Sequence, residues 1–184
     1  MNWHDQRPDD STGGAFMAEP PVSFSTVEPK LFREAMARLG AAVHVVTTNG
    51  PGGKHGFTAT AVSSVSDQPA TMLVCLNRRS RIIPVLRENG ILCVNTLRAG
   101  DDSVADVFAG RTGLTGAQRF LQGKWLTLAT GAPVLDTAVV SCDCRIIESK
   151  PVASHNVYFC GVVAVRQGEP GRALVYHDRE YKHV

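Results

Sequence analysis

The chain has 184 residues, of which 43% are hydrophobic and 20% are charged, and its formal net charge is +2. These values are typical of one globular domain with its own core, and they exclude a fibrous chain or one disordered over most of its length. So small a charge does not create the positive field that collects nucleic acid, although a local basic cluster can still bind a phosphate.

Residues 1–28 are predicted to form a flexible N-terminal arm. They mix Asp, Pro, Gly and Ser and show no apolar periodicity. The N-terminus lacks the basic start and apolar core of a signal peptide, and no apolar stretch approaches the length that spans a membrane. We therefore expect a cytoplasmic protein whose one domain covers residues 29–184.

The domain is predicted to begin with a helix and a hairpin. Pro29 suits a first helical turn, and Gly40 suits the end of the helix. The apolar residues between them recur at helical spacing: Leu31, Phe32, Ala35, Met36 and Leu39. Residues 42–48 then read as a strand, and Asn-Gly-Pro-Gly-Gly at 49–53 reads as the turn of a hairpin.

Most of the later elements are predicted to be strands. Residues 57–66 are rich in small and hydroxyl side chains, and residues 71–76 form an apolar strand of the kind buried on both faces. Ser80 is predicted to cap a short helix that ends at Gly90. Further strands are expected at 91–96, 139–147, 157–165 and 173–176, with a helix at 102–108. Because turns rather than crossover helices join the strands, we predict a mainly β fold with flanking helices, built as a closed antiparallel barrel.

Five cysteines lie inside apolar runs, at positions 75, 93, 142, 144 and 160. Cys142 and Cys144 would face the same side of a strand, so a metal site or a redox pair is conceivable. With no second pair of ligands nearby, the favoured interpretation is buried core thiols and no metal. The sequence also lacks the Gly-x-Gly-x-x-Gly, Walker, His-Glu-x-x-His and Gly-x-Ser-x-Gly motifs, which disfavours a Rossmann enzyme, an NTPase or an ordinary hydrolase.

Residues 56–66, Gly-Phe-Thr-Ala-Thr-Ala-Val-Ser-Ser-Val-Ser, are unusual for a strand. Hydroxyls and alanines replace the bulky branched residues that fill a core. Small side chains let a flat aromatic ligand approach the backbone while the hydroxyls hold a polar tail. The alternative interpretation is a Thr/Ser strand that faces solvent.

Residues 76–81, Leu-Asn-Arg-Arg-Ser-Arg, place an amide, three cations and a capping serine at the start of a helix. Backbone N–H groups and positive charge at one helix end can bind a phosphate. The alternative is an ordinary helix cap with solvated arginines. His155 and His177 lie near strand ends and could meet a ligand, although most such histidines are only solvated. Residues 179–183 have the composition of a polar tail.

Taken together, these segments resemble the short-chain flavin reductase family, whose members supply reduced flavin to two-component monooxygenases. The matching segments are residues 32–36, 42–48, 56–66, 73–77, 93–95, 108–113 and 174–176. The likeness covers about residues 30–184 and is closest to the reductases of the 4-hydroxyphenylacetate hydroxylase and pyrimidine-utilisation systems. It implies an antiparallel FMN-binding split β-barrel.

The resemblance also implies a set of site residues. The flavin, FMN or FAD, would contact Thr58, Ala59, Thr60, Ser63, Ser64, Cys75, Leu76, Asn77, Ser80, Arg81, Phe108, Ala109, Gly110 and Arg111. Within this set, Ser80 and a neighbouring arginine would hold the phosphate, and residues 108–111 would close over the flavin. His155 and Tyr181 would approach the nicotinamide of NADH or NADPH, with His155 positioning the ring for catalysis.

The implied reaction is hydride transfer from the nicotinamide to the flavin, in which the protein positions two stacked rings and needs no general base. A homodimer is expected, with the nicotinamide side partly built by the second subunit. The reduced flavin would pass to a separate monooxygenase. Three alternatives remain: an oxidase that retains its FMN, a flavin- or haem-binding carrier or sensor without reductase activity, and a purely structural barrel.

Overall fold

The computed structural model describes residues 25–184, so all but the last four residues of the predicted N-terminal arm lie outside the described part. The helices are α1 (Pro29–Ala37), α2 (Ile83–Asn89), α3 (Asp102–Phe108) and the 3-10 helix η1 (Gly116–Leu121). The strands are β1 (Ala41–Ala42), β2 (His44–Thr48), β3 (His55–Ala59), β4 (Val62–Asp67), β5 (Ala70–Asn77), β6 (Ile91–Thr96), β7 (Trp125–Thr127), β8 (Pro133–Leu135), β9 (Val140–Val152), β10 (His155–Gln167), β11 (Leu174–His177) and β12 (Glu180–His183).

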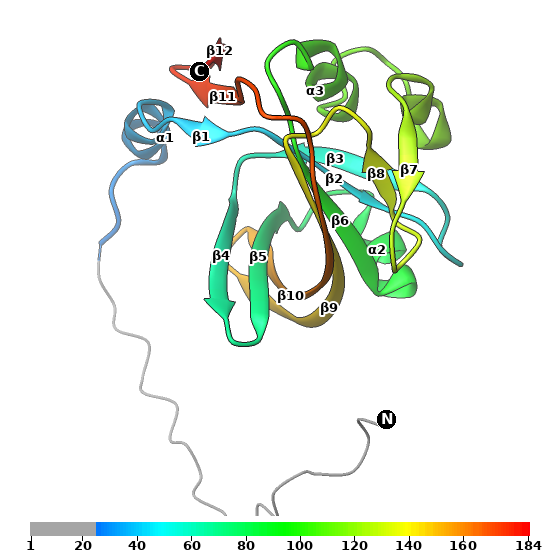
Figure 1. The fold of residues 1–184 in the computed structure, drawn as a ribbon. Coiled ribbons are helices and arrows are strands. Elements are labelled where there is room, and N and C mark those ends of the chain that lie inside the picture. The colour runs from blue at the N-terminus through cyan, green and yellow to red at the C-terminus, as the bar shows by residue number, and fades with distance from the viewer. Residues whose placement is uncertain (1–24) are drawn as a thin grey trace, which may run out of the picture.

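Seven strands form the main sheet, in the order β3-β2-β6-β9-β10-β5-β4, and every pairing in it is antiparallel. The sheet curls round a core (Figure 1), but its two edge strands, β3 and β4, form no ladder with each other in residues 25–184. The predicted antiparallel split barrel is therefore confirmed. The expectation that the barrel closes is wrong, because no ladder joins the two edge strands within the described residues.

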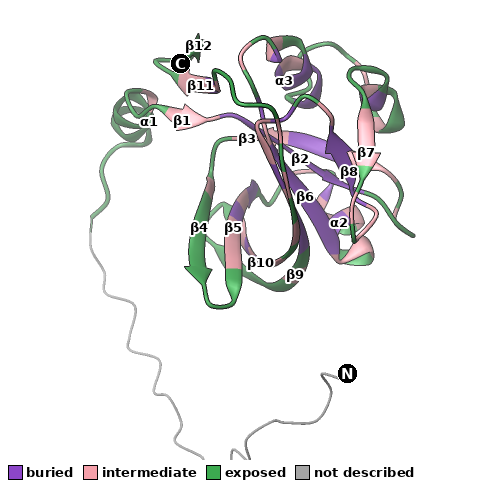
Figure 2. Ribbon diagram, in the orientation of Figure 1, coloured by how far each residue is buried: buried purple, intermediate pink, exposed green. Residues whose placement is uncertain are grey.

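The barrel core comes from the inward faces of the central strands. Figure 2 shows buried residues concentrated on β2 and β6, whereas α1 is exposed. Val46, Val74, Leu92 and Val94 are almost completely buried, and Leu86 of α2 packs against them. The predicted burial of β5 on both faces is wrong, because only Val74 and Leu76 of that strand are buried.

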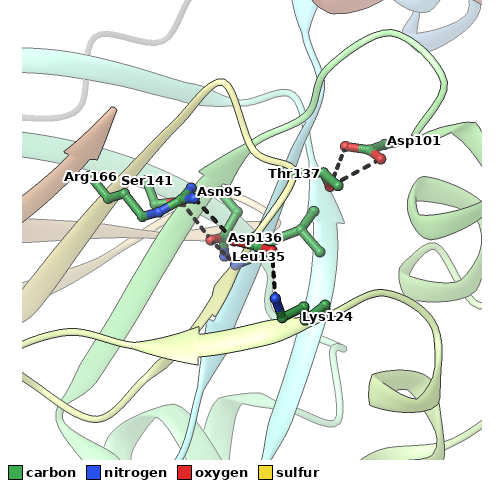
Figure 3. Close-up of polar contacts among 8 residues, drawn as sticks. All are labelled: Asn95, Asp101, Lys124, Leu135, Asp136, Thr137, Ser141 and Arg166. Carbon is green, nitrogen blue, oxygen red and sulfur yellow. Dashed lines mark hydrogen bonds and ion pairs between the residues drawn. The ribbon is translucent and has the colours of Figure 1, made fainter. Parts of the chain in front are cut away.

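Asn95 of β6 is fully buried and joins three neighbouring strands. Its Oδ1 accepts hydrogen bonds from the Leu135 backbone N–H at 2.8 Å and from Ser141 Oγ at 2.9 Å, and its Nδ2 donates to the Val45 carbonyl at 3.0 Å. Asp136, the residue that follows β8, is also held in place, because it forms ion pairs with Lys124 and Arg166 (Figure 3). A buried amide with all these partners specifies one arrangement of the strands.

Two predicted local structures are corrected. Ser80 does not cap α2, because the helix begins at Ile83 and its N-cap is Ile82. The N–H groups of Arg79 and Ser80 are bound by the side chain and the carbonyl of Asn77, respectively, in a separate turn. The predicted polar tail at residues 179–183 is mostly strand β12.

The C-terminal strands β11 and β12 form a tight hairpin. The register pairs His177 with Glu180, and the two loop residues, Asp178 and Arg179, both have positive φ. Two consecutive residues of positive φ are typical of the type I′ turn that matches strand twist. The hairpin pairs with β1 through β11 and so lies beside α1 (Figure 1).

His44 makes the stability of this fold depend on pH. Its imidazole is buried, and burial lowers its pKa from 6.5 to about 4. Above pH 6.5 neither the folded nor the unfolded state is protonated there, whereas between pH 6.5 and 4 the unfolded state binds the proton first. We expect the free energy of unfolding to fall by about 3 kcal/mol across that range through this group.

Denaturant unfolding of the wild type, His44→Gln and His177→Gln at several pH values measures this effect. His177 is exposed and serves as the matched control. The His44→Gln variant should lose less stability on acidification than the other two proteins. An equally steep loss in all three proteins would contradict the assignment.

Candidate functional site

The site lies where the barrel is split. Strand β3 ends at Ala59 and β4 begins at Val62, so only Thr60 and Ala61 connect the opposite edges of the sheet. The Ala61 carbonyl accepts a hydrogen bond from the Cys75 N–H at 2.9 Å. This bond brings the end of β5 beside the small-residue segment that follows β3.

A cavity of about 210 Å³ opens beside Thr58, Ala59 and Thr60. Residues distant in the sequence build its other walls. They are Val43 before β2, Ala109 and Arg111 after α3, Tyr176 of β11 and Tyr181 of β12. The cavity therefore combines small and hydroxyl side chains on one side with a cation and two phenols on the other.

Close packing between β3 and α3 holds in place the cavity wall that Ala109 and Arg111 form after α3. A Cβ atom added to Gly56 would lie 2.7 Å from Phe108 Cε1 and 3.0 Å from the Val46 carbonyl oxygen, so only glycine fits there. Thr58 Oγ1 donates to the Ala105 carbonyl at 2.7 Å. Arg119 of η1 donates to the carbonyls of both Gly56 and Phe108 at 3.2 Å.

The charged and phenolic groups of the cavity are connected to one another. Asp106 Oδ1 accepts hydrogen bonds from Arg111 Nη1 at 2.7 Å and from the Tyr181 hydroxyl at 3.2 Å. The Arg111 guanidinium also lies 5.6 Å from the centre of the Tyr181 ring. The hydrogen bond to Asp106 raises the pKa of Arg111, and burial raises the pKa of Tyr181 to about 12. At neutral pH the cavity therefore presents a cation and a protonated phenol.

A larger hollow of about 620 Å³ adjoins this cavity and shares Thr60 and Tyr176 with it. Its other wall includes Phe32 and Met36 of α1 and Leu39, which follows the helix. The polar cavity and the apolar hollow thus meet at Thr60 and Tyr176.

A second polar region lies at the end of β5. Asn77, Arg78 and Arg79 line a hollow of about 560 Å³ together with Ala153 and Ser154 of the β9–β10 turn. His155 is the first residue of β10 and pairs with Asn77 in the ladder. In residues 25–184, Arg78, Arg79 and Arg81 form no ion pair with a carboxylate, so their positive charges are available to a ligand.

The structure brings some of the predicted site residues together and separates others. Thr58, Ala59, Thr60, Ala109, Arg111 and Tyr181 line the first cavity. Asn77 lines the hollow at the end of β5, with His155 beside it rather than beside Tyr181. The remaining residues line neither space: Ser63 and Ser64 are exposed on β4, and Leu76 and Phe108 are buried in the core. Ser80 and Gly110 lie next to lining residues in the chain, and Cys75 and Arg81 lie two positions from one.

Sequence reasoning missed several residues that shape the site. Tyr176 lines the cavity, Asp106 binds two of the lining side chains, and Arg119 fixes the wall after α3. Asp106 sits four residues after Asp102 on a predicted helix, which is the only sequence signal that it shares a face with another carboxylate. Arg119 lies in a segment without apolar periodicity and gives no such signal.

The cysteines lie apart from both polar regions, except Cys75 at the end of β5. All five are free thiols, and Cys93, Cys144 and Cys160 are buried. Burial raises the pKa of Cys160 to about 12, and it raises the pKa of Cys93 and Cys144 as well. Thiols with raised pKa values are poor nucleophiles, which agrees with a packing role.

Within the described part of the chain, no helix is both long and apolar enough to cross a bilayer.

The curled antiparallel sheet, with a polar cavity at the open seam between β3 and β4, defines a split-barrel protein. Residues 36–184 match the flavin reductase like domain, so the chain belongs to this family. The chain is 50% identical over 162 residues to the FMN reductase (NADH) RutF 2 of Rhizobium rhizogenes strain K84. The match covers 88% of this chain and 92% of that protein.

Solved structures agree with this assignment. A flavin reductase crystal structure from Haemophilus somnus 129PT shares 44% identity at a TM-score of 0.82, and the match covers 86% of this chain and all of that one. BorF, the flavin reductase component of a bacterial two-component tryptophan halogenase, shares 26% identity at a TM-score of 0.79. That match covers 85% of this chain and 98% of BorF.

Proposed function

We propose that this protein is an NADH-dependent flavin reductase that transfers a hydride from NADH to FMN and releases the reduced flavin to a separate monooxygenase. The observation that carries the proposal is the cavity at the seam, where residues 58–60 face Arg111 and Tyr181. Family membership and the NADH-dependent FMN reductases among its relatives point to the same reaction.

The seam fits the flavin ring system. Thr58, Ala59 and Thr60 have small side chains, so a planar ring can approach their backbone closely. The outer edges of β3 and β4 pair with no other strand in residues 25–184, so backbone N–H and C=O groups near the seam are available to the ring's polar edge. Arg111 on the opposite wall supplies positive charge that stabilises the reduced ring, which gains negative charge.

The end of β5 fits the phosphate of FMN. The carbonyl of Ala61, beside the cavity, accepts a hydrogen bond from the Cys75 N–H. Asn77 lies two residues after Cys75, and two residues span about 7 Å along a strand. A ribityl chain can cover that distance. Arg78, Arg79 and Arg81 then offer guanidinium groups, the preferred partners of phosphate oxygens, near a turn whose Asn77 orients the backbone. Ser80 has an intermediate exposure and would add a hydroxyl here.

In the reaction itself the protein positions the two substrates. The nicotinamide donates a hydride to the flavin ring, and no side chain has to carry a proton for that transfer. Tyr181 and Tyr176 form the wall that the nicotinamide would meet, and their rings contact each other edge to face at 5.6 Å. His155 lies at the other polar region, beside Asn77, so it would approach a nicotinamide only across a dimer, where it would face the cavity of the second subunit.

We propose that two copies of the chain associate. Helix α1 has no buried residue, and Leu31, Phe32 and Met36 expose between 43% and 58% of their surface. A helix whose apolar residues are all uncovered is unusual in a soluble monomer. The uncovered side also lines the hollow that continues into the site, so a second subunit here would complete the nicotinamide side.

The remaining features follow the same proposal. FMN is the expected flavin, with FAD as a second substrate, because a site exposed at the phosphate end leaves room for an added nucleotide. The protein is proposed to act in the cytoplasm, where NADH is available. An FMN-retaining oxidase and a non-enzymatic carrier are the competing functions, and activity with free FMN separates them from a reductase.

The purified protein should oxidise NADH only when free FMN is added. Following absorbance at 340 nm with and without FMN, and measuring the flavin left after desalting, tests this directly. Rapid FMN-dependent turnover with little retained flavin is expected. NADH oxidation absent at every FMN concentration would defeat the reductase, and tightly retained flavin would favour the oxidase.

Arg81→Gln should weaken the binding of FMN but not that of riboflavin, which lacks the phosphate. A charge-assisted hydrogen bond to phosphate is worth about 1.5–3 kcal/mol, so the KM for FMN should rise roughly tenfold or more. Arg87→Gln, on the exposed side of α2, is the matched control. Equal changes with both flavins would show that Arg81 does not recognise the phosphate.

Phe32→Asp should weaken the dimer, because it puts a charge on the apolar side of α1. Sedimentation velocity over a range of concentrations would measure the shift toward monomer. Lys30→Asp also adds negative charge, on a side chain that is 83% exposed, and is the control. A wild type that is monomeric at all concentrations, or a Phe32→Asp variant that associates as well as the control, would contradict the proposed interface.

A further inference from the structure

We propose that Asp106 is a positioning residue, whose carboxylate holds Arg111 and Tyr181 together on one wall of the cavity beside residues 58–60. The inference rests on the proposed function, since Arg111 is proposed to meet the flavin and Tyr181 the nicotinamide. Asp106 would thereby set the position of one substrate relative to the other.

The geometry places one carboxylate oxygen between the two side chains. Asp106 Oδ1 lies 2.7 Å from Arg111 Nη1 and 3.2 Å from the Tyr181 hydroxyl. Both partners line the cavity, whereas Asp106 does not. Asp106 would therefore act through its partners rather than by touching a substrate. Because both contacts use the same oxygen, moving the carboxylate displaces both side chains at once.

Asp106 is itself fixed by a rigid base. The buried side chains of Val104, Ala105 and Val107 attach α3 to the core, and the Ala105 carbonyl accepts the hydrogen bond from Thr58. The Asp106 carbonyl also accepts the Arg111 N–H at 3.0 Å. The backbone of residue 111 is thus held independently of the Asp106 side chain, which leaves the carboxylate to orient the guanidinium.

A second contact of the same kind supplies a natural control. Asp102, one helical turn before Asp106, lies 3.0 Å from His183 Nε2, while Asp106 binds Tyr181. Four residues along a helix and two along a strand both span about 6–7 Å, so the two carboxylates match alternate residues of β12. Both contacts attach β12 to α3, but only Asp106 binds side chains that line the cavity.

The ion pair has little effect on stability. The side chains of Arg111 and Asp106 are 53% and 38% exposed, and ion pairs at such positions contribute little to folding. Tyr181 is a neutral phenol at neutral pH, as tyrosines ordinarily are, and burial raises its pKa further, to about 12. Removing the carboxylate should therefore leave the fold intact and release two side chains from their positions.

The test compares Asp106→Ala and Asp106→Asn with Asp102→Ala in the full-length protein. A misplacement of about 1 Å can reduce a rate about a hundredfold, so we expect kcat/KM for NADH to fall at least about tenfold in Asp106→Ala. Asp106→Asn, which keeps an acceptor but loses the charge, should lie between Asp106→Ala and the wild type. Asp102→Ala should match the wild type, and all unfolding midpoints should agree within about 2 °C.

Comparing a triple variant with a double variant shows whether Asp106 acts through its partners. If it does, Asp106→Ala combined with Tyr181→Phe and Arg111→Gln should be no slower than Tyr181→Phe with Arg111→Gln alone. Effects that multiply would mean that Asp106 acts independently and would overturn the inference. A loss of activity equal to that of Asp102→Ala, or one that follows a lowered unfolding midpoint, would reduce Asp106 to a structural residue.

The outcome for Asp106 can be separated from that for the proposed function. A wild type that never oxidises NADH with free FMN would defeat the reductase, and with it the role assigned to Asp106. A wild type that turns over while Asp106→Ala turns over equally fast would defeat only the inference.

Discussion

The architecture depends on the two-residue connection between β3 and β4. These strands are the opposite edges of a seven-stranded sheet, and six strand spacings in a flat sheet would separate them by about 29 Å. The three peptide steps from Ala59 to Val62 span at most about 11 Å. The sheet must therefore curl until its edges almost meet at this connection, yet in residues 25–184 the two edge strands form no ladder with each other.

This constraint also creates the site. The seam leaves unpaired strand edges next to small side chains, and elements from elsewhere cover it only in part. Helix α3 approaches β3 because Gly56 has no side chain to keep Phe108 away, and the C-terminal hairpin approaches α3 through Tyr181 and Asp106. A polar cavity therefore forms where the barrel fails to close, and its walls come from four separate parts of the chain.

Local patterns predicted the elements that local physics decides. The β2–β3 hairpin, β6 and α3 follow from a glycine-rich turn, an apolar run and helical spacing. The break at Thr60 was not predictable, because residues 58–61, Thr-Ala-Thr-Ala, have similar small side chains on both sides of the break and give no signal where one strand stops. β12 was missed because its one inward residue, Tyr181, gains its burial from partners far along the chain. Ser80 looked like a cap because the competing turn at Asn77 depends on geometry rather than composition.

The exposure of the site bears on whether flavin is retained or released. Pockets that hold a ligand firmly bury most of its surface. Here Thr60, Arg111 and the arginines after β5 are exposed, and Arg111 is already paired with a carboxylate that competes with any anionic ligand. Binding that relies on exposed, partly neutralised cations is weak and reversible. Such a site favours a protein that takes up a flavin, reduces it and lets it go over one that keeps it as a permanent cofactor.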